Sequence, residues 1–284
     1  MPLRILGCSN VKVYGLTLRD SGGDGIYVAR GATQAHCKDI YLKDLVCDNH
    51  YRQGISVISA DGLLVENCVF QNTWGTPPCA GVDLEPDVAT EMLRRIVFRN
   101  CLFKDNLGDG IQVWPPHLRA ESGEISILFD ECRVTSKWGS GIRVGKLGDQ
   151  VPGGVVEFRD CTVENTAGYG IRIRDKSADR ARVRFINCTV RNTATDRAYR
   201  GPWAPVYVSL EVLKQTKKMG GIDFINCLVE DDKDRPAVLI EGEIQNLGLF
   251  DVTGDITVRN PYGLKYTPPE KQTDVTLVVK QSEW

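Results

Sequence analysis

The sequence predicts an all-β solenoid, in which short strands coil into turns stacked along one axis. A glycine followed by alternating hydrophobic residues recurs as GIYV at Gly25, GISV at Gly54, GVDL at Gly81, GIQV at Gly110, GIRV at Gly141 and GIRI at Gly170. Successive copies lie 29, 27, 29, 31 and 29 residues apart. No 3.6-residue hydrophobic periodicity separates them, so no crossover helix is available for a βαβ unit. Each repeat must coil back onto the previous one and pair in parallel.

A second unit lies between the glycine repeats, in which two short strands flank a bend, as in GLLVENCVFQNT and VRFINCTVRNT. Six of the ten cysteines follow Asn, Asp or Glu at this bend: Cys68, Cys101, Cys132, Cys161, Cys188 and Cys227. Each precedes a Phe or Val by two residues, which is the alternation of an inward-facing strand. We therefore expect a column of buried free thiols. The absence of a CxxC pair argues against a zinc site.

Weaker glycine-type repeats follow at PVYV (Pro205) and AVLI (Ala237), so the solenoid should extend through most of the chain. At roughly 29 residues per rung, a single domain over residues 1–284 would hold about nine or ten rungs. The start, MPLRILGCSN, lacks the pattern of a signal peptide, and no amphipathic capping helix precedes GIYV. We expect that an N-terminal cap is missing.

The composition excludes several classes of protein. The chain is 42% hydrophobic and 25% charged with a formal net charge of -2, which is typical of a globular protein. No basic excess indicates a nucleic-acid partner, and no apolar run approaches the roughly 20 residues of a membrane helix.

The segments RQGISVIS, VENCVFQNT and AGVDLEP resemble the right-handed parallel β-helix superfamily, the pectate-lyase-like fold, and in particular bacterial and phage members assigned to polysaccharide breakdown. The resemblance covers nearly the whole length. It implies a single-stranded right-handed parallel β-helix, a polysaccharide or oligosaccharide partner, and a secreted or periplasmic location. The rung pattern is specific for the fold and much weaker for the activity.

The segment AGVDLEPD places carboxylates at alternate positions of a predicted strand. Because residues two apart point to the same side, we expect Asp83 and Glu85 side by side on one exposed face, with Asp109 one rung away and Arg143 about two. Asp87 lies beyond Pro86, where the strand should end. A solvated outer face kept charged for solubility is the plain alternative. Function is favoured because like charges this close are costly on a sheet without a partner.

Longer connections flank the same face and could wall a groove, and Trp74, Trp114, Trp138 and Trp203 lie near it. The candidate substrate-binding residues are Arg52, Gln112, Trp114, Arg143, Arg172 and Trp74. The arginines have a second interpretation as electrostatic partners of the carboxylates. The three histidines are isolated from one another in the sequence, which argues against a histidine-centred triad.

The leading hypothesis is a glycoside hydrolase without a cofactor. Two of Asp83, Glu85 and Asp109 would flank a glycosidic bond, one as general acid and the other activating water or attacking directly. By analogy with β-helix hydrolases that cluster aspartates on adjacent rungs, inversion is favoured. The Asn-Thr-Asp, Asp-Asp, Gly-His-Gly and Arg-Ile-Lys set of polygalacturonases is missing, which disfavours pectin hydrolysis.

Two alternatives stay open. In a polysaccharide lyase, Asp83, Glu85 and Asp87 would hold Ca²⁺, and Arg143, Lys146 or Arg172 would abstract a proton from a uronate. Arginine is a poor base unless its surroundings lower its pKa. The other alternative is a non-catalytic β-helix: a glycan-binding or adhesive module, or an inactive fragment.

Overall fold

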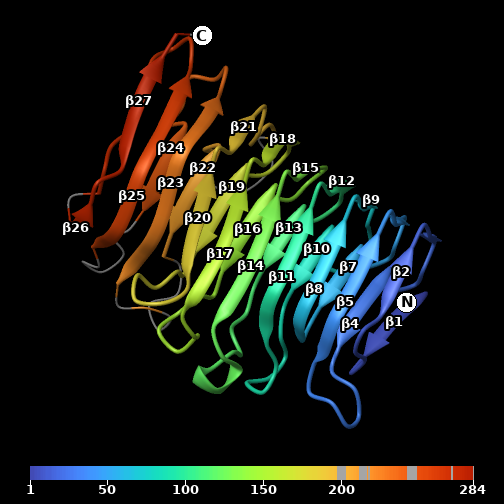
Figure 1. Cartoon of the computed structure of the whole chain (residues 1–284). Coiled ribbons are helices and arrows are strands. Elements are labelled where there is room, and N and C mark those ends of the chain that lie inside the picture. Colours follow the sequence, from blue (N-terminus) through green and yellow to red (C-terminus); the bar gives the residue numbers. More distant parts are fainter. Residues whose placement is uncertain (197–202, 211–215, 217, 242–247, 270, 284) are drawn as a thin grey trace.

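The computed structural model of the chain is a solenoid of parallel strands whose rungs follow one another in chain order, with the termini at opposite ends (Figure 1). It describes residues 1–196, 203–210, 216, 218–241, 248–269 and 271–283. Every strand pairing within the described part is parallel. The predicted all-β solenoid is therefore confirmed.

The glycine repeats form one face of the solenoid, here called the first face. Its nine-stranded sheet contains β1 (Leu3–Leu6), β4 (Ile26–Ala29), β7 (Ile55–Val57), β10 (Val82–Leu84), β13 (Ile111–Val113), β16 (Ile142–Gly145), β19 (Ile171–Arg174), β22 (Val206–Ser209) and β24 (Val238–Glu241). Nine stacked strands among the described residues agree with the expected nine or ten rungs.

Two further faces form a second sheet. The second face contains β2 (Lys12–Tyr14), β5 (Cys37–Lys43), β8 (Ala60–Glu66), β11 (Leu93–Arg99), β14 (Ile125–Asp130), β17 (Gly154–Arg159) and β20 (Arg182–Ile186). The third contains β3 (Thr17–Arg19), β6 (Val46–Asp48), β9 (Val69–Gln71), β12 (Leu102–Asn106), β15 (Arg133–Ser136), β18 (Thr162–Thr166) and β21 (Thr189–Arg191). The long strands β23 (Met219–Glu230) and β25 (Leu249–Arg259) continue both faces, and β26 (Gln272–Val275) and β27 (Val278–Ser282) pair with β25. One 3₁₀ turn, η1 (Ala120–Ser122), follows β13.

The core is built from columns of identical side chains. Phe98, Phe129, Phe158, Phe185 and Phe224 stack in one column, with neighbouring ring centroids 4.8 to 5.4 Å apart and nearly parallel planes. This spacing is close to the roughly 4.8 Å between neighbouring strands, so each ring lies almost directly over the next. Each rung therefore buries its apolar side chains against its neighbours.

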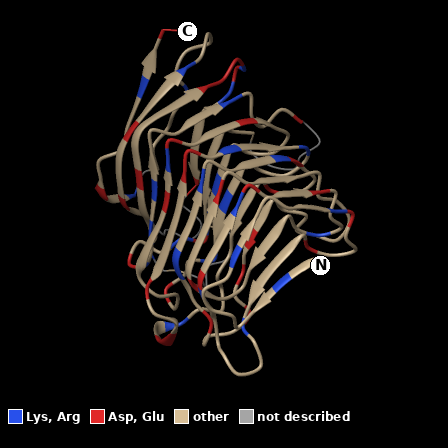
Figure 2. Ribbon diagram, turned by 45° about the vertical axis from the view of Figure 1, so that its right-hand side comes forward, with Lys and Arg blue, Asp and Glu red and all other residues tan. Residues whose placement is uncertain are grey.

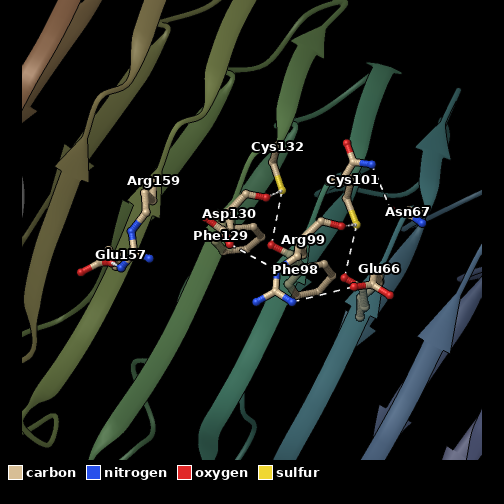
Figure 3. Close-up of polar contacts among 12 residues, drawn as sticks. Glu66, Asn67, Phe98, Arg99, Cys101, Phe129, Asp130, Cys132, Glu157 and Arg159 are labelled. Carbon is tan, nitrogen blue, oxygen red and sulfur yellow. Dashed lines mark hydrogen bonds and ion pairs between the residues drawn. The ribbon is translucent and has the colours of Figure 1, made fainter.

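The predicted cysteine column is also confirmed, since all ten cysteines are free and nine are buried. The Cys101 thiol donates to the Val65 carbonyl of the preceding rung at 3.5 Å. The Cys132 thiol donates to the Phe98 carbonyl at the same distance (Figure 3). The thiols thus donate hydrogen bonds between rungs in addition to filling space. Sequence periodicity alone predicted only the filling of space.

The bend before each cysteine uses the left-handed backbone region, with φ near +50° at Asn67, Asn100 and Glu131. Asparagine tolerates this region better than most residues. The Asn100 amide donates to the Asn67 side-chain oxygen of the previous rung at 2.9 Å. Basic and acidic residues alternate with uncharged ones along the ribbon, without a region of a single sign (Figure 2). Within the described part, no helix is long and apolar enough to cross a membrane.

Candidate functional site

Asp83 occupies the middle of β10, in register with Ser56 of β7 and Gln112 of β13. It lies on the outer side of the first face, but only 1% of the residue is exposed, so the predicted exposure is wrong. The reason is that amides of the adjacent rungs close around the carboxyl group. Gln112 Nε2 donates to its Oδ1 at 2.9 Å, and Gln53 Nε2 donates to its Oδ2 at 3.0 Å.

Glu85, two residues further on, is half-buried, and its carboxyl group forms a hydrogen bond with that of Asp83. Burial raises the pKa of Asp83 to about 7, and the charge of Glu85 adds to this shift. Burial also raises the pKa of Glu85, although Arg52 and the hydrogen bond with Asp83 oppose the increase. Carboxyl groups in contact titrate as a pair, so the two together retain one proton up to about neutral pH.

Asp109 stands at the start of the next rung and is 7% exposed. Its Oδ1 accepts the Ser140 backbone N–H at 2.7 Å, and its Oδ2 lies 3.4 Å from Arg143 Nη1. The same Nη1 is 3.4 Å from Gln112 Oε1. Arg143 and Gln112 thus connect the Asp109 carboxylate to Asp83. The expected proximity of Asp109 and Arg143 to the acidic pair is confirmed.

A hollow of about 440 Å³ opens above these groups. We call it the carboxylate groove, and it is lined by Pro77, Pro78, Glu85, Leu107, Gly108, Asp109, Gln112, Trp114, Trp138, Gly139 and Arg143. Glu85 and Asp109 are therefore its two lining carboxylates. Asp83 lies beneath it and is not part of the lining. Pro77 and Pro78 lie in NTWGTPPCA, one of the longer connections expected to wall a groove, whereas the sequence analysis missed Leu107.

Trp114 lines the groove but is not the open platform that the sequence suggested. The Arg143 guanidinium lies over its ring at 4.3 Å from the centroid, and Arg174 and Lys146 lie over it at 5.3 and 5.7 Å. The ring also packs against Gly145, where an added Cβ would come within 2.4 Å of it. The glycine that ends GIRVG makes room for the indole.

The other candidate binding residues lie outside this lining. Arg52 Nη1 is 3.7 Å from Asp24 Oδ2, so Arg52 pairs with a carboxylate of the preceding rung. The Arg172 guanidinium lies over the Tyr169 ring at 5.3 Å. Trp74 lines a separate hollow. Of the six candidate binding residues, Gln112, Trp114 and Arg143 line the carboxylate groove.

The three carboxylates of the conditional calcium site, Asp83, Glu85 and Asp87, differ in their surroundings. Among the described residues, no three His, Cys, Asp or Glu side chains are arranged to hold a metal ion. Both oxygens of Asp83 face the amides of Gln53 and Gln112. Asp87 is exposed beyond Pro86, and its N–H donates to Glu91 Oε2 at 2.6 Å. Asp83 and Glu85 thus share a hydrogen bond, whereas Asp87 acts on Glu85 through its charge.

A larger hollow, of about 560 Å³, lies toward the C-terminal rungs, where Ala194, Thr195, Trp203, Lys233, Asp234 and Arg235 line it. Among the described residues of that lining, Asp234 is the single carboxylate. It therefore offers no pair of carboxyl groups for acid and base work. The carboxylate groove is the stronger candidate despite its smaller volume.

Comparison with known proteins agrees with this architecture. The family model described as the right handed beta helix region matches residues 3–115. The N-terminal part of the chain is thus similar to that family, and the described rungs that follow it continue the same parallel strand pairing. Among solved structures, this β-helix is similar to the crystal structure of the Agl-KA catalytic domain, with a TM-score of 0.48 and 14% sequence identity. The match covers 93% of this chain and 53% of that one, so the β-helix spans about half its length. No curated protein matches the sequence.

Proposed function

We propose that this β-helix is a glycoside hydrolase that cleaves a polysaccharide in the carboxylate groove. The observation that supports the proposal is the hydrogen-bonded pair of Asp83 and Glu85, whose pKa values are both raised and whose outer member lines the groove together with Asp109. A carboxyl group that stays protonated near neutral pH is what protonation of a glycosidic oxygen requires.

The geometry suggests a division of roles. Glu85 is the general acid, because it reaches the groove. Asp83 is a positioning residue that shares the proton from beneath. Asp109 is the second carboxylate, held by Arg143 and the Ser140 N–H, and it would activate water. Because Asp109 would activate water and would not attack the sugar itself, the expected outcome is inversion at the anomeric carbon.

The proposal is tested with a panel of neutral and acidic polysaccharides, with and without a chelator. New reducing ends and the ultraviolet absorbance of unsaturated products are both measured. We expect reducing ends without unsaturated products, and a loss of about 10² to 10⁴ in rate for Glu85→Gln, the usual contribution of acid–base catalysis. Glu157→Gln is the control, because Glu157 is a half-buried carboxylate of β17 on the second face.

Each contrary outcome points to a different class of protein. Unsaturated products that disappear with chelator would indicate a lyase. Binding of a glycan without turnover would indicate a non-catalytic module. Equal losses in Glu85→Gln and Glu157→Gln would show that the effect is structural and would remove Glu85 from the site.

A further inference from the structure

A second elongated hollow lies beside the carboxylate groove, along the edge of the third face. It measures about 460 Å³ and is lined by Arg19, Asp48, Asn49, Asn72, Thr73, Trp74, Leu107 and Lys137. We call it the Trp74 hollow. Leu107 lines both hollows, so the two adjoin at this side chain.

The Trp74 hollow follows the axis of the solenoid. Its lining residues lie at or just after the ends of β3, β6, β9, β12 and β15, which are consecutive strands of the third face. At about 4.8 Å per rung, five rungs extend over roughly 19 Å. A site of this shape suits a linear ligand better than a compact one.

The Trp74 ring is 49% exposed, yet its position is fixed. Its backbone N–H donates to the His50 carbonyl at 3.0 Å, and its ring meets Tyr51 edge-on, with centroids 4.7 Å apart. Gly75 has φ +95°, and a Cβ there would lie 2.6 Å from the Tyr51 ring. Because the ring is already held in place, little side-chain conformational entropy is lost when a flat apolar ligand stacks on it.

Polar groups beside the ring are also held in place. Asp48 Oδ1 accepts the Asn72 amide at 2.7 Å, and its Oδ2 lies 3.1 Å from Arg19 Nη2. Because Arg19 and Asp48 offset each other's charge, this end of the hollow presents fixed donors and acceptors with little net charge. A sugar has an apolar ring face and hydroxyl groups at its rim. It therefore matches a rigid indole that lies beside polar groups whose charges offset each other.

We propose that the Trp74 hollow is a saccharide-binding subsite, which holds an uncleaved stretch of the polysaccharide chain that continues past Leu107 into the carboxylate groove. The ligand of this subsite is therefore a polysaccharide chain long enough to occupy both hollows. This inference rests on the proposed function for the identity of the chain.

The test measures binding separately from turnover. In the Glu85→Gln background, Trp74→Ala is compared with its parent by affinity electrophoresis in gels that contain each polysaccharide of the panel. We expect binding to weaken about 10- to 100-fold, the usual consequence of truncating a Trp anchor. Trp74→Phe, which keeps an aromatic face, should recover part of the affinity and guards against a general folding defect.

The matched control is Tyr14→Ala. Tyr14 is also 49% exposed and also meets a second ring edge-on, that of Tyr41, but it lies in β2 on another face. Unchanged binding in Trp74→Ala, equal weakening in Tyr14→Ala, or no retardation of the parent in any gel would each overturn the subsite. Weaker binding by Trp74→Ala without cleavage by the wild type would overturn the hydrolase proposal and leave the subsite standing. Cleavage by the wild type together with unchanged binding by Trp74→Ala would overturn the subsite and leave the hydrolase proposal standing.

Discussion

Asp83 shows how one buried carboxyl group connects the stability of the fold with its proposed chemistry. Two amides donate to it, and it shares a hydrogen bond with Glu85. Because its pKa in the folded protein is about 7 against an ordinary value of 3.8, the folded chain binds more protons than the unfolded chain between these limits. The stability that this carboxyl contributes is complete below about pH 4 and is lost as the pH rises through 7.

Asp83→Asn should lower the rate of hydrolysis at pH 7 about 100-fold, within the range for acid–base catalysis. Only Glu85 then holds the proton, without a charged carboxylate beside it, so the alkaline limb of the pH–rate profile should move to lower pH. The measurement is kcat/KM on the cleaved polysaccharide between pH 4 and 9.

The same variant leaves one glutamine amide without an acceptor, because the new Asn nitrogen cannot accept a hydrogen bond. We expect a loss of about 1 kcal/mol at pH 5 in urea unfolding, and a smaller or reversed difference at pH 8. Asp87→Asn is the control, since Asp87 is exposed in the same segment. A wild-type pH–rate profile in Asp83→Asn would show that the acidic pair is not the proton donor.

The alternation of residues predicted the right neighbours but not their burial. It placed Asp83 and Glu85 on one side of the strand and Asp109 and Arg143 on the following rungs, as the structure has them. It could not show that Gln53 and Gln112 enclose Asp83, because that depends on side-chain conformations on two other rungs. Nor could it separate Trp74 from the groove, because that follows from the paths of loops.

At the scale of the element, the spacing of the glycine repeats predicted the register of the first face correctly, and this includes its last two strands, β22 and β24. The second unit was less regular than expected. At the bend before Cys227, Asn226 keeps a left-handed φ of +53°, but this bend lies within the single long strand β23. The register between β23 and β25 shifts at this point. Sequence shows the bend residue, whereas the length of the strand depends on pairing with two faces at once.

Gly145, the last residue of β16, links that strand to the site. In Gly145→Ala the new Cβ would stand 2.4 Å from the Trp114 ring, so the indole and the Arg143 guanidinium stacked on it must shift. We expect about a 10-fold loss of kcat/KM, because small misplacements of binding groups are costly. The free energy of unfolding should fall by only about 1 to 3 kcal/mol, as for other overpacked sites.

Gly153→Ala is the control for this prediction, because an added Cβ there would meet nothing within 4 Å. Tryptophan fluorescence quenching by iodide gives a second measurement, since a displaced Trp114 should be more accessible. Full activity in Gly145→Ala with unchanged quenching would show that the packing of Trp114 on this glycine does not position the groove.

At the scale of the whole molecule, the hydrophobic core runs along the axis of the solenoid, and each rung is stabilised by the rungs on either side. The stability of such a chain is approximately a sum of rung and interface contributions. The phenylalanine column passes through five successive rungs, and Phe129 lies in it between Phe98 and Phe158. Phe224 packs on Phe185 toward the C-terminal end. The repeat in the sequence predicted this architecture because identical residues recur once per rung.

Phe129→Ala should therefore weaken the contact between two halves of the molecule, as well as the rung itself. Loss of a buried Phe costs about 3 to 5 kcal/mol, and unfolding in urea should separate into two transitions. Circular dichroism follows both halves. With Trp203 and Trp284 replaced by Phe in every variant, the fluorescence of Trp74, Trp114 and Trp138 reports the N-terminal half. Phe224→Ala, a truncation of the same chemistry, should destabilise the C-terminal rungs and leave the tryptophan transition close to that of the wild type. A single transition at the wild-type midpoint in Phe129→Ala would contradict nearest-neighbour stabilisation in this solenoid.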